Sequence, residues 1–215
     1  YGHEVSEVIA RVLTWDRKAG ELKTLSNTEC EFAYRSSRFK REKDRYVVLD
    51  VTFQLRQGEM SLPIAYKELA EHLGVELGAR ALVTDVRKAV LELRGRKGMV
   101  LDKKDHDTWS AGSFFVNPIV DASIAAKLPS DTPKWPQSDG RVKLSAAWLM
   151  ERSGVHKGSA HNGAGVSSKH VLALVNNGSA TSADMLELAR IAKAAVQEKF
   201  GIELEPEVRF VGCDL

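Results

Sequence analysis

The clearest pattern in the sequence is a regular alternation of apolar side chains across residues 47–55. Val47, Leu49, Val51, Phe53 and Leu55 occupy every second position, and mostly polar residues stand between them. Successive side chains of a β-strand point to opposite faces of a sheet, so this period favours a strand. We therefore predict a half-buried strand here, with these five side chains on one face.

Other strand and helix patterns are interspersed along the rest of the chain. Strands are predicted at residues 5–16, 21–25, 114–120, 165–168, 171–176 and 208–211. Helices are predicted at residues 66–74, 84–95, 122–128, 144–152 and 183–200, with one short helical turn at the capping-box pair Ser26 and Glu29 and a loop at 129–140. Because these elements lack the regular spacing of β-α-β units, the sequence predicts an α+β fold.

The composition is that of an ordinary folded protein, with 43% hydrophobic and 28% charged residues over 215 positions. This length allows one large domain or two small ones, and the polar stretch at residues 99–110 is the predicted boundary. A formal net charge of +2 gives no global field that would demand nucleic acid or an anionic membrane. No apolar run approaches the ~20 residues of a membrane span.

The two cysteines, Cys30 and Cys213, are far apart and fit no metal-binding or redox spacing. They favour a reducing compartment, and we predict no metal site. No dinucleotide-binding, P-loop or H-E-x-x-H motif occurs. The chain opens on Tyr1 with neither Met nor a signal peptide, so we expect further residues upstream.

Residues 34–45 form a basic segment with six Lys and Arg residues and two interleaved aromatic residues, Tyr34 and Phe39. Surfaces that bind nucleic acid have this composition, although a solvated loop is the usual explanation of such a charge run. An arginine beside an aromatic ring could also be a fixed cation, because guanidinium keeps its charge on burial and its fork suits carboxylate or phosphate. Arg35 is the candidate for that role.

Residues 94–98 place three cations and two glycines directly after a predicted helix end. They could bring backbone and charge close to phosphate groups. Equally, cations stabilise the negative end of a helix dipole and glycine terminates helices. The spacing leaves both interpretations open.

Ser113 follows the small residues Ala111 and Gly112 and precedes Phe114 and Phe115. The small residues allow a ligand to approach the backbone, and the two rings would bury and fix the strand that carries the hydroxyl. No His stands at a triad spacing, so Ser113 suits proton or hydrogen-bond donation better than nucleophilic attack. Most serines in turns only satisfy backbone groups, and that alternative stays open.

Three carboxylates, Glu203, Glu205 and Glu207, alternate before the predicted last strand. A solvated strand edge is the usual interpretation, and Pro206 is typical of such an edge. A Glu held beside a fixed Arg could instead be an electrostatic group of a catalytic site.

Taken in order along the chain, three of these segments resemble the UDP-N-acetylenolpyruvoylglucosamine reductase (MurB) family. The matching segments are 34–40, 112–118 and 204–209, with supporting stretches at 1–4, 146–151, 154–158 and 168–176. Tyr66 is similar to the substrate-clamping tyrosine of the family's first structural type, and residues 94–102 and 212–213 resemble actinobacterial members. The family's upstream flavin-binding region, with its glycine-rich segment, has no counterpart in this sequence.

The resemblance implies that residues 1–100 are the later part of an FAD-binding half and that residues 101–215 are a smaller α+β substrate-binding domain. It implies a cytoplasmic, monomeric oxidoreductase that binds neither nucleic acid nor a membrane. That enzyme reduces UDP-N-acetylglucosamine enolpyruvate to UDP-N-acetylmuramate, with FAD as cofactor and NADPH as cosubstrate. The alternative is a truncated module that binds the UDP-sugar without turnover.

The resemblance also implies three catalytic residues. Arg35 would stabilise the substrate carboxylate and the negative charge that develops beside it. Glu207 would orient Arg35, and Ser113 would be the general acid that protonates the intermediate carbon.

Five further residues are implied to bind substrate or cofactor. Tyr66, Lys97 and Asn117 match positions that contact the UDP moiety. Tyr1 and Gly2 are implied to bind the FAD cofactor.

Overall fold

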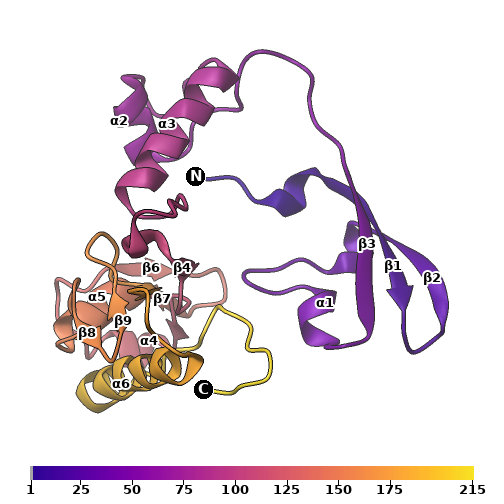
Figure 1. The fold of residues 1–215 in the computed structure, drawn as a ribbon. Helices are drawn as coiled ribbons and strands as arrows, with labels where there is room; N and C mark the ends of the chain where they lie inside the picture. Colours follow the sequence, from indigo (N-terminus) through magenta and orange to yellow (C-terminus); the bar gives the residue numbers. More distant parts are fainter. Residues whose placement is uncertain (1) are drawn as a thin grey trace. The chain divides into compact units, whose positions relative to one another are not determined.

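A computed structural model describes residues 2–215 and divides the chain into two compact units, one ending at Val90 and the other comprising Leu91–Leu215. The division falls within helix α3 (Val83–Arg96) (Figure 1). Both units mix helices and small sheets, so the predicted α+β class is confirmed. Among the described residues, the structure contains no helix with the length and apolar character that crossing a bilayer requires.

The first unit is built on an antiparallel sheet of order β2-β1-β3, formed by β1 (Ile9–Asp16), β2 (Glu21–Ser26) and β3 (Tyr46–Phe53). The predicted hairpin of residues 5–16 and 21–25 is confirmed, with Asp16 opposite Glu21 beside the turn. Its first strand starts later than predicted, because Val5–Val8 form a 3-10 helix. Val12 of β1 and Leu25 of β2 form a small core with Cys30.

The strand predicted from the alternation at residues 47–55 exists as β3, but its predicted buried face is wrong. Val47, Leu49 and Phe53 are 45%, 53% and 48% exposed, whereas Val51 packs on the core. The pairing with β1 shifts register at Leu49, which is an extra residue in a β-bulge. Because a bulge reverses the side-chain phase, Val47 and Val51 face opposite sides. Leu55 lies beyond the strand and is exposed.

The helices of the first unit follow the predicted end signals closely. Ser26 and Glu29 exchange hydrogen bonds beside the short 3-10 helix Thr28–Cys30, which confirms the predicted turn. Helix α1 (Arg38–Arg41) was not predicted, and α2 (Lys67–Leu73) ends as expected at Gly74 in the left-handed conformation. Helix α3 runs one residue beyond its predicted end at Gly95, to Arg96.

The second unit contains two antiparallel sheets. One has the order β4-β10-β9-β8 and the other β5-β7-β6. Their strands are β4 (Ser110–Ser113), β5 (Ile119–Val120), β6 (Lys134–Pro136), β7 (Val142–Leu144), β8 (Ala160–His161), β9 (Ala164–Val166) and β10 (Ala173–Asn176). The helices are α4 (Ala122–Ala125), α5 (Ala146–Arg152) and α6 (Ser182–Phe200). Helix α6, the yellow helix of Figure 1, packs on β9, β10 and α5.

The core of this unit joins the two Phe residues next to Ser113 to α5 and α6. Phe115, Leu149 and Leu174 are at most 1% exposed in the same cluster as Leu188 and Val196. The expected start of α6 is confirmed, because Thr181 and Asp184 form a complete capping box.

Three predictions for the second unit need correction. Residues 114–120 are not one strand, because Phe115 only bridges to Pro206 between β4 and β5. Residues 208–211 form no strand, and the C-terminal segment instead bridges to Phe115 at Pro206, with hydrogen bonds at Glu205 and Glu207. The loop at 129–140 contains the short strand β6.

Candidate functional site

Arg35 lies at the tip of a tight turn in the first unit. The amides of Ala33 and Ser36 donate to each other's carbonyls over 3.0 Å, and Tyr34 and Arg35 form the tip between them. Arg35 has a φ of 51°, the left-handed region, which costs a residue with a Cβ roughly 1–3 kcal/mol. Its guanidinium carbon lies 5.8 Å from the centre of the Tyr34 ring. Such strain gathers at functional sites, so the backbone supports Arg35 as a candidate.

Ion pairs from helix α1 surround the Arg35 turn. Glu31 accepts a hydrogen bond of 2.5 Å from Nη2 of Arg38 and another from Arg41. Arg41 also donates from Nη1 to the hydroxyl of Ser36, over 3.3 Å. The turn that carries Arg35 is therefore held to α1 by side chains as well as by its own backbone.

A second ion-pair group ties the end of the basic segment to the sheet. Arg45 donates from Nη2 to the buried carboxylate of Asp16 over 2.8 Å and from Nη1 to Glu42 over 2.5 Å. The hydrogen bond from Arg45 lowers the pKa of Asp16 to about 2, and the backbone amides of Lys18 and Ala19 add to this effect against the opposing effect of burial. Carboxylates thus neutralise several cations of the basic segment.

We expect acid to weaken the first unit through Asp16. A carboxyl group whose pKa is about 2 when folded and about 3.9 when unfolded stabilises the fold at pH 7 and loses that contribution as the pH falls from about 4 through 2. Asp16→Asn should lower the melting temperature at pH 7 and flatten its decline in acid. Thermal unfolding followed by circular dichroism checks this, with exposed Asp50→Asn as the control. An unchanged acid profile in Asp16→Asn contradicts the assignment.

The structure brings Ser113 and Glu207 onto neighbouring segments of the second unit. Ser113 ends β4 and pairs with Ala173 of β10, after Gly112 with a φ of 86°. One residue later, the carbonyl of Phe114 accepts a 2.7 Å hydrogen bond from the amide of Glu207. The buried Phe114 ring fixes this arrangement.

Lys97 follows helix α3 in a crowded loop. At the next residue, Gly98, a Cβ would lie 3.1 Å from the carbonyl oxygen of Asp107, and the φ of 70° also favours glycine. The pKa of the His170 imidazole is lowered, first by burial and then by the positive charges of Lys97 and Lys157. Two cations therefore act on one partly buried ring, an environment that suits an anionic ligand. The sequence alone missed Lys157 and His170.

Asn117 has a structural contact that the sequence did not reveal. Its side-chain Oδ1 accepts a 3.0 Å hydrogen bond from the amide of Ala146, the first residue of α5. Ser145 caps the same helix by accepting from the amide of Trp148. Asn117 therefore links the loop after Ser113 to the start of α5, and its amide nitrogen is a candidate donor to a ligand.

Two variants of Asn117 separate these roles. Asn117→Ala should cost about 1 kcal/mol of unfolding free energy, because the helix loses an acceptor at its N-terminus. Asn117→Asp keeps that acceptor and should retain most of the stability. Both variants lose the amide donor, and the UDP contact that the family resemblance implies for Asn117 predicts weaker UDP binding in both. Chemical denaturation and calorimetric titration with UDP measure the two effects. Wild-type UDP affinity in both variants would exclude Asn117 from the binding site.

Tyr66 and Gly2 lie next to one another in the first unit. Tyr66 precedes helix α2 as its N-cap residue and is 44% exposed. Gly2 has a φ of 85°, and a Cβ there would lie 3.1 Å from the Cβ of Ala65 and 3.7 Å from the amide of Tyr66. Only glycine suits this close backbone approach. Tyr1, the other predicted cofactor residue, lies outside the described residues.

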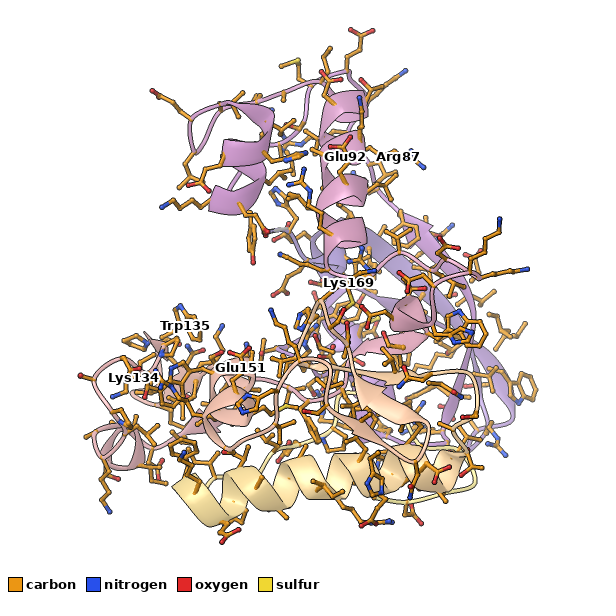
Figure 2. All side chains as sticks on the ribbon, turned by 60° about the vertical axis from the view of Figure 1, so that its left-hand side comes forward. Arg87, Glu92, Lys134, Trp135, Glu151 and Lys169 are labelled. Atoms are coloured by element: carbon orange, nitrogen blue, oxygen red, sulfur yellow. The ribbon has the colours of Figure 1, made fainter. Side chains whose placement is uncertain are left out.

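The sheet β5-β7-β6 contains an aromatic group that the sequence did not single out. Trp135 is 45% exposed on β6 and pairs with Lys143 of β7, whose ammonium lies 5.8 Å from its ring centre. Figure 2 shows Trp135 close to Lys134, the residue that precedes it in β6. Lys143 is opposite Ile119, two residues beyond Asn117. An exposed ring with a cation beside it suits stacking against a nucleobase and pairing with a phosphate.

The predicted site residues are thus divided between the two units. Arg35, Tyr66 and Gly2 belong to the first unit, and the other four described residues belong to the second. Across residues 2–215, no three His, Cys, Asp or Glu side chains gather in a way that could hold a metal ion.

The chain is similar to known proteins along its whole length. The model of the UDP-N-acetylenolpyruvoylglucosamine reductase C-terminal domain matches residues 103–211. Proteins named UDP-N-acetylenolpyruvoylglucosamine reductase from Cutibacterium acnes and Streptomyces coelicolor are 52% and 49% identical over 100% of this chain, and over 57% and 59% of their own lengths. The structure of the Thermus caldophilus MurB reductase matches 95% of this chain and 53% of its own with a TM-score of 0.54 and 22% identity.

These matches place this α+β chain in a class of proteins that are named as reductases. More particularly, the chain belongs to the UDP-N-acetylenolpyruvoylglucosamine reductase (MurB) family. It spans about three fifths of the length of the curated relatives that it matches.

Proposed function

We propose that the protein containing this chain reduces UDP-N-acetylglucosamine enolpyruvate to UDP-N-acetylmuramate, with NADPH as the reductant and FAD as the bound cofactor. The observation that carries the proposal is the backbone pairing that places Ser113 and Glu207 on adjacent segments, in a chain 52% identical to a protein named for this reductase.

Reduction of the enolpyruvyl group requires a cation that stabilises negative charge and a group that donates a proton. A bound flavin would supply hydride to the terminal carbon of the enolpyruvyl group, which would leave negative charge on the carbon next to the carboxylate. The guanidinium of Arg35 stabilises that charge, because its fork matches a carboxylate and cannot lose its proton. Ser113 donates its hydroxyl proton to the carbon, and Glu207 orients Arg35.

One feature of the described residues, the backbone at Gly2, suits close contact with a flavin. Gly2 adopts a positive φ where a side chain would collide with Ala65, so bare backbone is exposed next to Tyr66. We assign Gly2 to the cofactor and Tyr66 to the substrate. The two residues thereby provide neighbouring contacts within one unit.

Besides Tyr66, the second unit supplies contacts to the nucleotide in this proposal. Lys97 and Lys157 pair with the diphosphate, and the amide nitrogen of Asn117 donates to the UDP moiety. Trp135 stacks on the uracil ring beside Lys143. These residues supply cations, a donor and an aromatic face, which a nucleotide sugar requires.

We also propose that the protein acts in the cytoplasm and does not bind nucleic acid. Cys30 and Cys213 are free thiols, which suits a reducing compartment. Arg38, Arg41 and Arg45 are paired with carboxylates, so half of the six cations of the basic segment already have an acidic partner within the protein.

Turnover by the complete protein tests the proposal. Purified protein should show a flavin absorbance spectrum, consume NADPH only when UDP-N-acetylglucosamine enolpyruvate is present, and yield a product heavier than the substrate by one dihydrogen. Absence of flavin or of that product refutes it.

The alternative for the 215-residue chain on its own is a module that binds the UDP-sugar without turnover, supported by the positions of Lys97 and Asn117 within one unit. Calorimetric titration of this chain with the substrate distinguishes the two. Binding without a flavin spectrum or NADPH consumption is the expected result for the module.

A further inference from the structure

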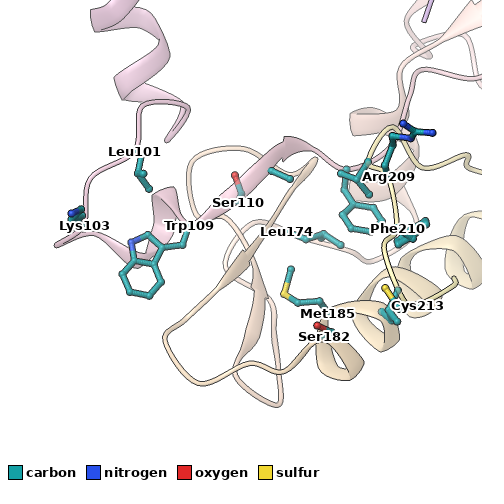
Figure 3. A pocket seen from close by; sticks show the side chains of 14 residues that line it. Leu101, Lys103, Trp109, Ser110, Leu174, Ser182, Met185, Arg209, Phe210 and Cys213 are labelled. Atoms are coloured by element: carbon teal, nitrogen blue, oxygen red, sulfur yellow. The ribbon is translucent and has the colours of Figure 1, made fainter. Parts of the chain in front are cut away.

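The second unit contains a cavity of about 590 Å³ that the proposed function does not use (Figure 3). It lies along β4 and β10, the first turns of α6 and the C-terminal segment. Its size is in the range of sites that enclose small organic molecules. Ser113, Glu207, Asn117 and Lys97 are not among its lining residues.

The walls of the cavity are mainly apolar. Trp109, Phe114, Leu174, Met185 and Phe210 contribute aromatic and aliphatic surface. Phe114 and Leu174 are buried in the core, so this part of the wall is fixed by packing. A ligand with a flat or branched apolar body would gain burial here without rearranging the core.

The cavity is lined by two positively charged side chains. Lys103 and Arg209 line it, and no Asp or Glu does. Figure 3 shows these two side chains at opposite ends, Lys103 beside Leu101 and Arg209 beside Phe210. Neither forms an ion pair with any described residue. An unpaired cation at each end complements an anionic group at each end of a ligand.

We propose that this cavity is a second ligand site, which binds an elongated organic dianion with an apolar middle. The apolar body lies against Leu174 and Met185, and its two carboxylates pair with Lys103 and Arg209. The site does not depend on the proposed reductase activity, because it consists entirely of residues of the second unit.

Cys213 provides a direct readout of occupancy. Its thiol lines the cavity, whereas the other free cysteine, Cys30, is buried in the first unit. A bound molecule should shield Cys213 from a thiol reagent such as dithionitrobenzoate. The rate of its modification therefore reports binding without any enzymatic assay.

The test compares three probes of one shape. Biphenyl-4,4'-dicarboxylate has an anion at both ends, biphenyl-4-carboxylate at one, and the 4,4'-dicarboxamide at neither. We expect the dicarboxylate to slow Cys213 modification at least about fivefold at saturation and to bind about threefold to tenfold more tightly than the monoacid, because exposed ion pairs contribute modestly. Equal affinities for dicarboxylate and dicarboxamide, or no protection of Cys213, overturn the proposal.

Charge-removing variants complete the test. Lys103→Ala and Arg209→Ala should each reduce the affinity for the dicarboxylate to about that for the monoacid and leave the dicarboxamide unaffected. Lys127→Ala removes an exposed cation of the same unit that does not line the cavity, and it should change nothing. The side chains of Lys103 and Arg209 are exposed, so both alanine variants should fold. Undiminished dicarboxylate binding in both variants also refutes the site.

Discussion

Ser113→Ala in the complete protein should slow substrate reduction about 10²- to 10⁴-fold while leaving flavin reduction by NADPH unchanged. The factor is that of a positioned general acid, and only the second half-reaction needs a proton on carbon. Stopped-flow absorbance measures the two steps separately, first with NADPH alone and then with reduced protein and substrate.

Ser110→Ala is the matched control for this prediction. Ser110 begins β4, the strand that Ser113 ends, and its hydroxyl accepts a 3.2 Å hydrogen bond from the amide of Gly112. Its loss should affect the strand locally but remove no proton donor. Reoxidation of the flavin at the wild-type rate in Ser113→Ala, or equal slowing in both variants, would show that Ser113 is not the acid.

Local signals in the sequence predicted the elements whose ends are fixed by local chemistry. Thr181 and Asp184 form the capping box at the start of α6, and Gly74 ends α2 in the left-handed conformation. These features depend on neighbours within a few residues, so they can be predicted from the local sequence.

Features that depend on pairing between distant segments could not be predicted. The bulge at Leu49 is set by the register with β1, and it reverses the face of Val47. The C-terminal segment was expected to form a strand at 208–211, but its register with Phe115 uses the backbone around Pro206 instead. Register is a property of two segments, and each segment alone is compatible with several.

The candidate site shows the same division. The segments around Arg35, Ser113 and Glu207 could be identified from the sequence by their resemblance to a known family. The left-handed φ of Arg35 could not be predicted, because it arises in the turn closed by Ala33 and Ser36. The Trp135–Lys143 pair was missed because its members come together only through strand pairing.

Arg35→Lys in the complete protein should reduce the rate of the second half-reaction by about 10²- to 10³-fold, the range for losing one preorganised group that stabilises a developing anion. Lysine keeps the positive charge but loses the planar pair of donors that matches a carboxylate. Flavin reduction by NADPH should be unaffected. Stopped-flow measurement of flavin reoxidation by substrate gives both results.

Arg35→Gly distinguishes the backbone strain at this position from the chemical role of the guanidinium. Arg35 adopts a φ of 51°, which glycine occupies at little cost, so Arg35→Gly should raise the unfolding free energy by about 1 kcal/mol. The same variant should lose substrate reduction, because no cation remains. Arg17→Lys, an exposed arginine of the same unit, should alter neither property. A more stable but inactive Arg35→Gly is the result expected if the turn holds Arg35 in a strained conformation for catalysis. A glycine variant with normal turnover would instead make Arg35 a surface cation.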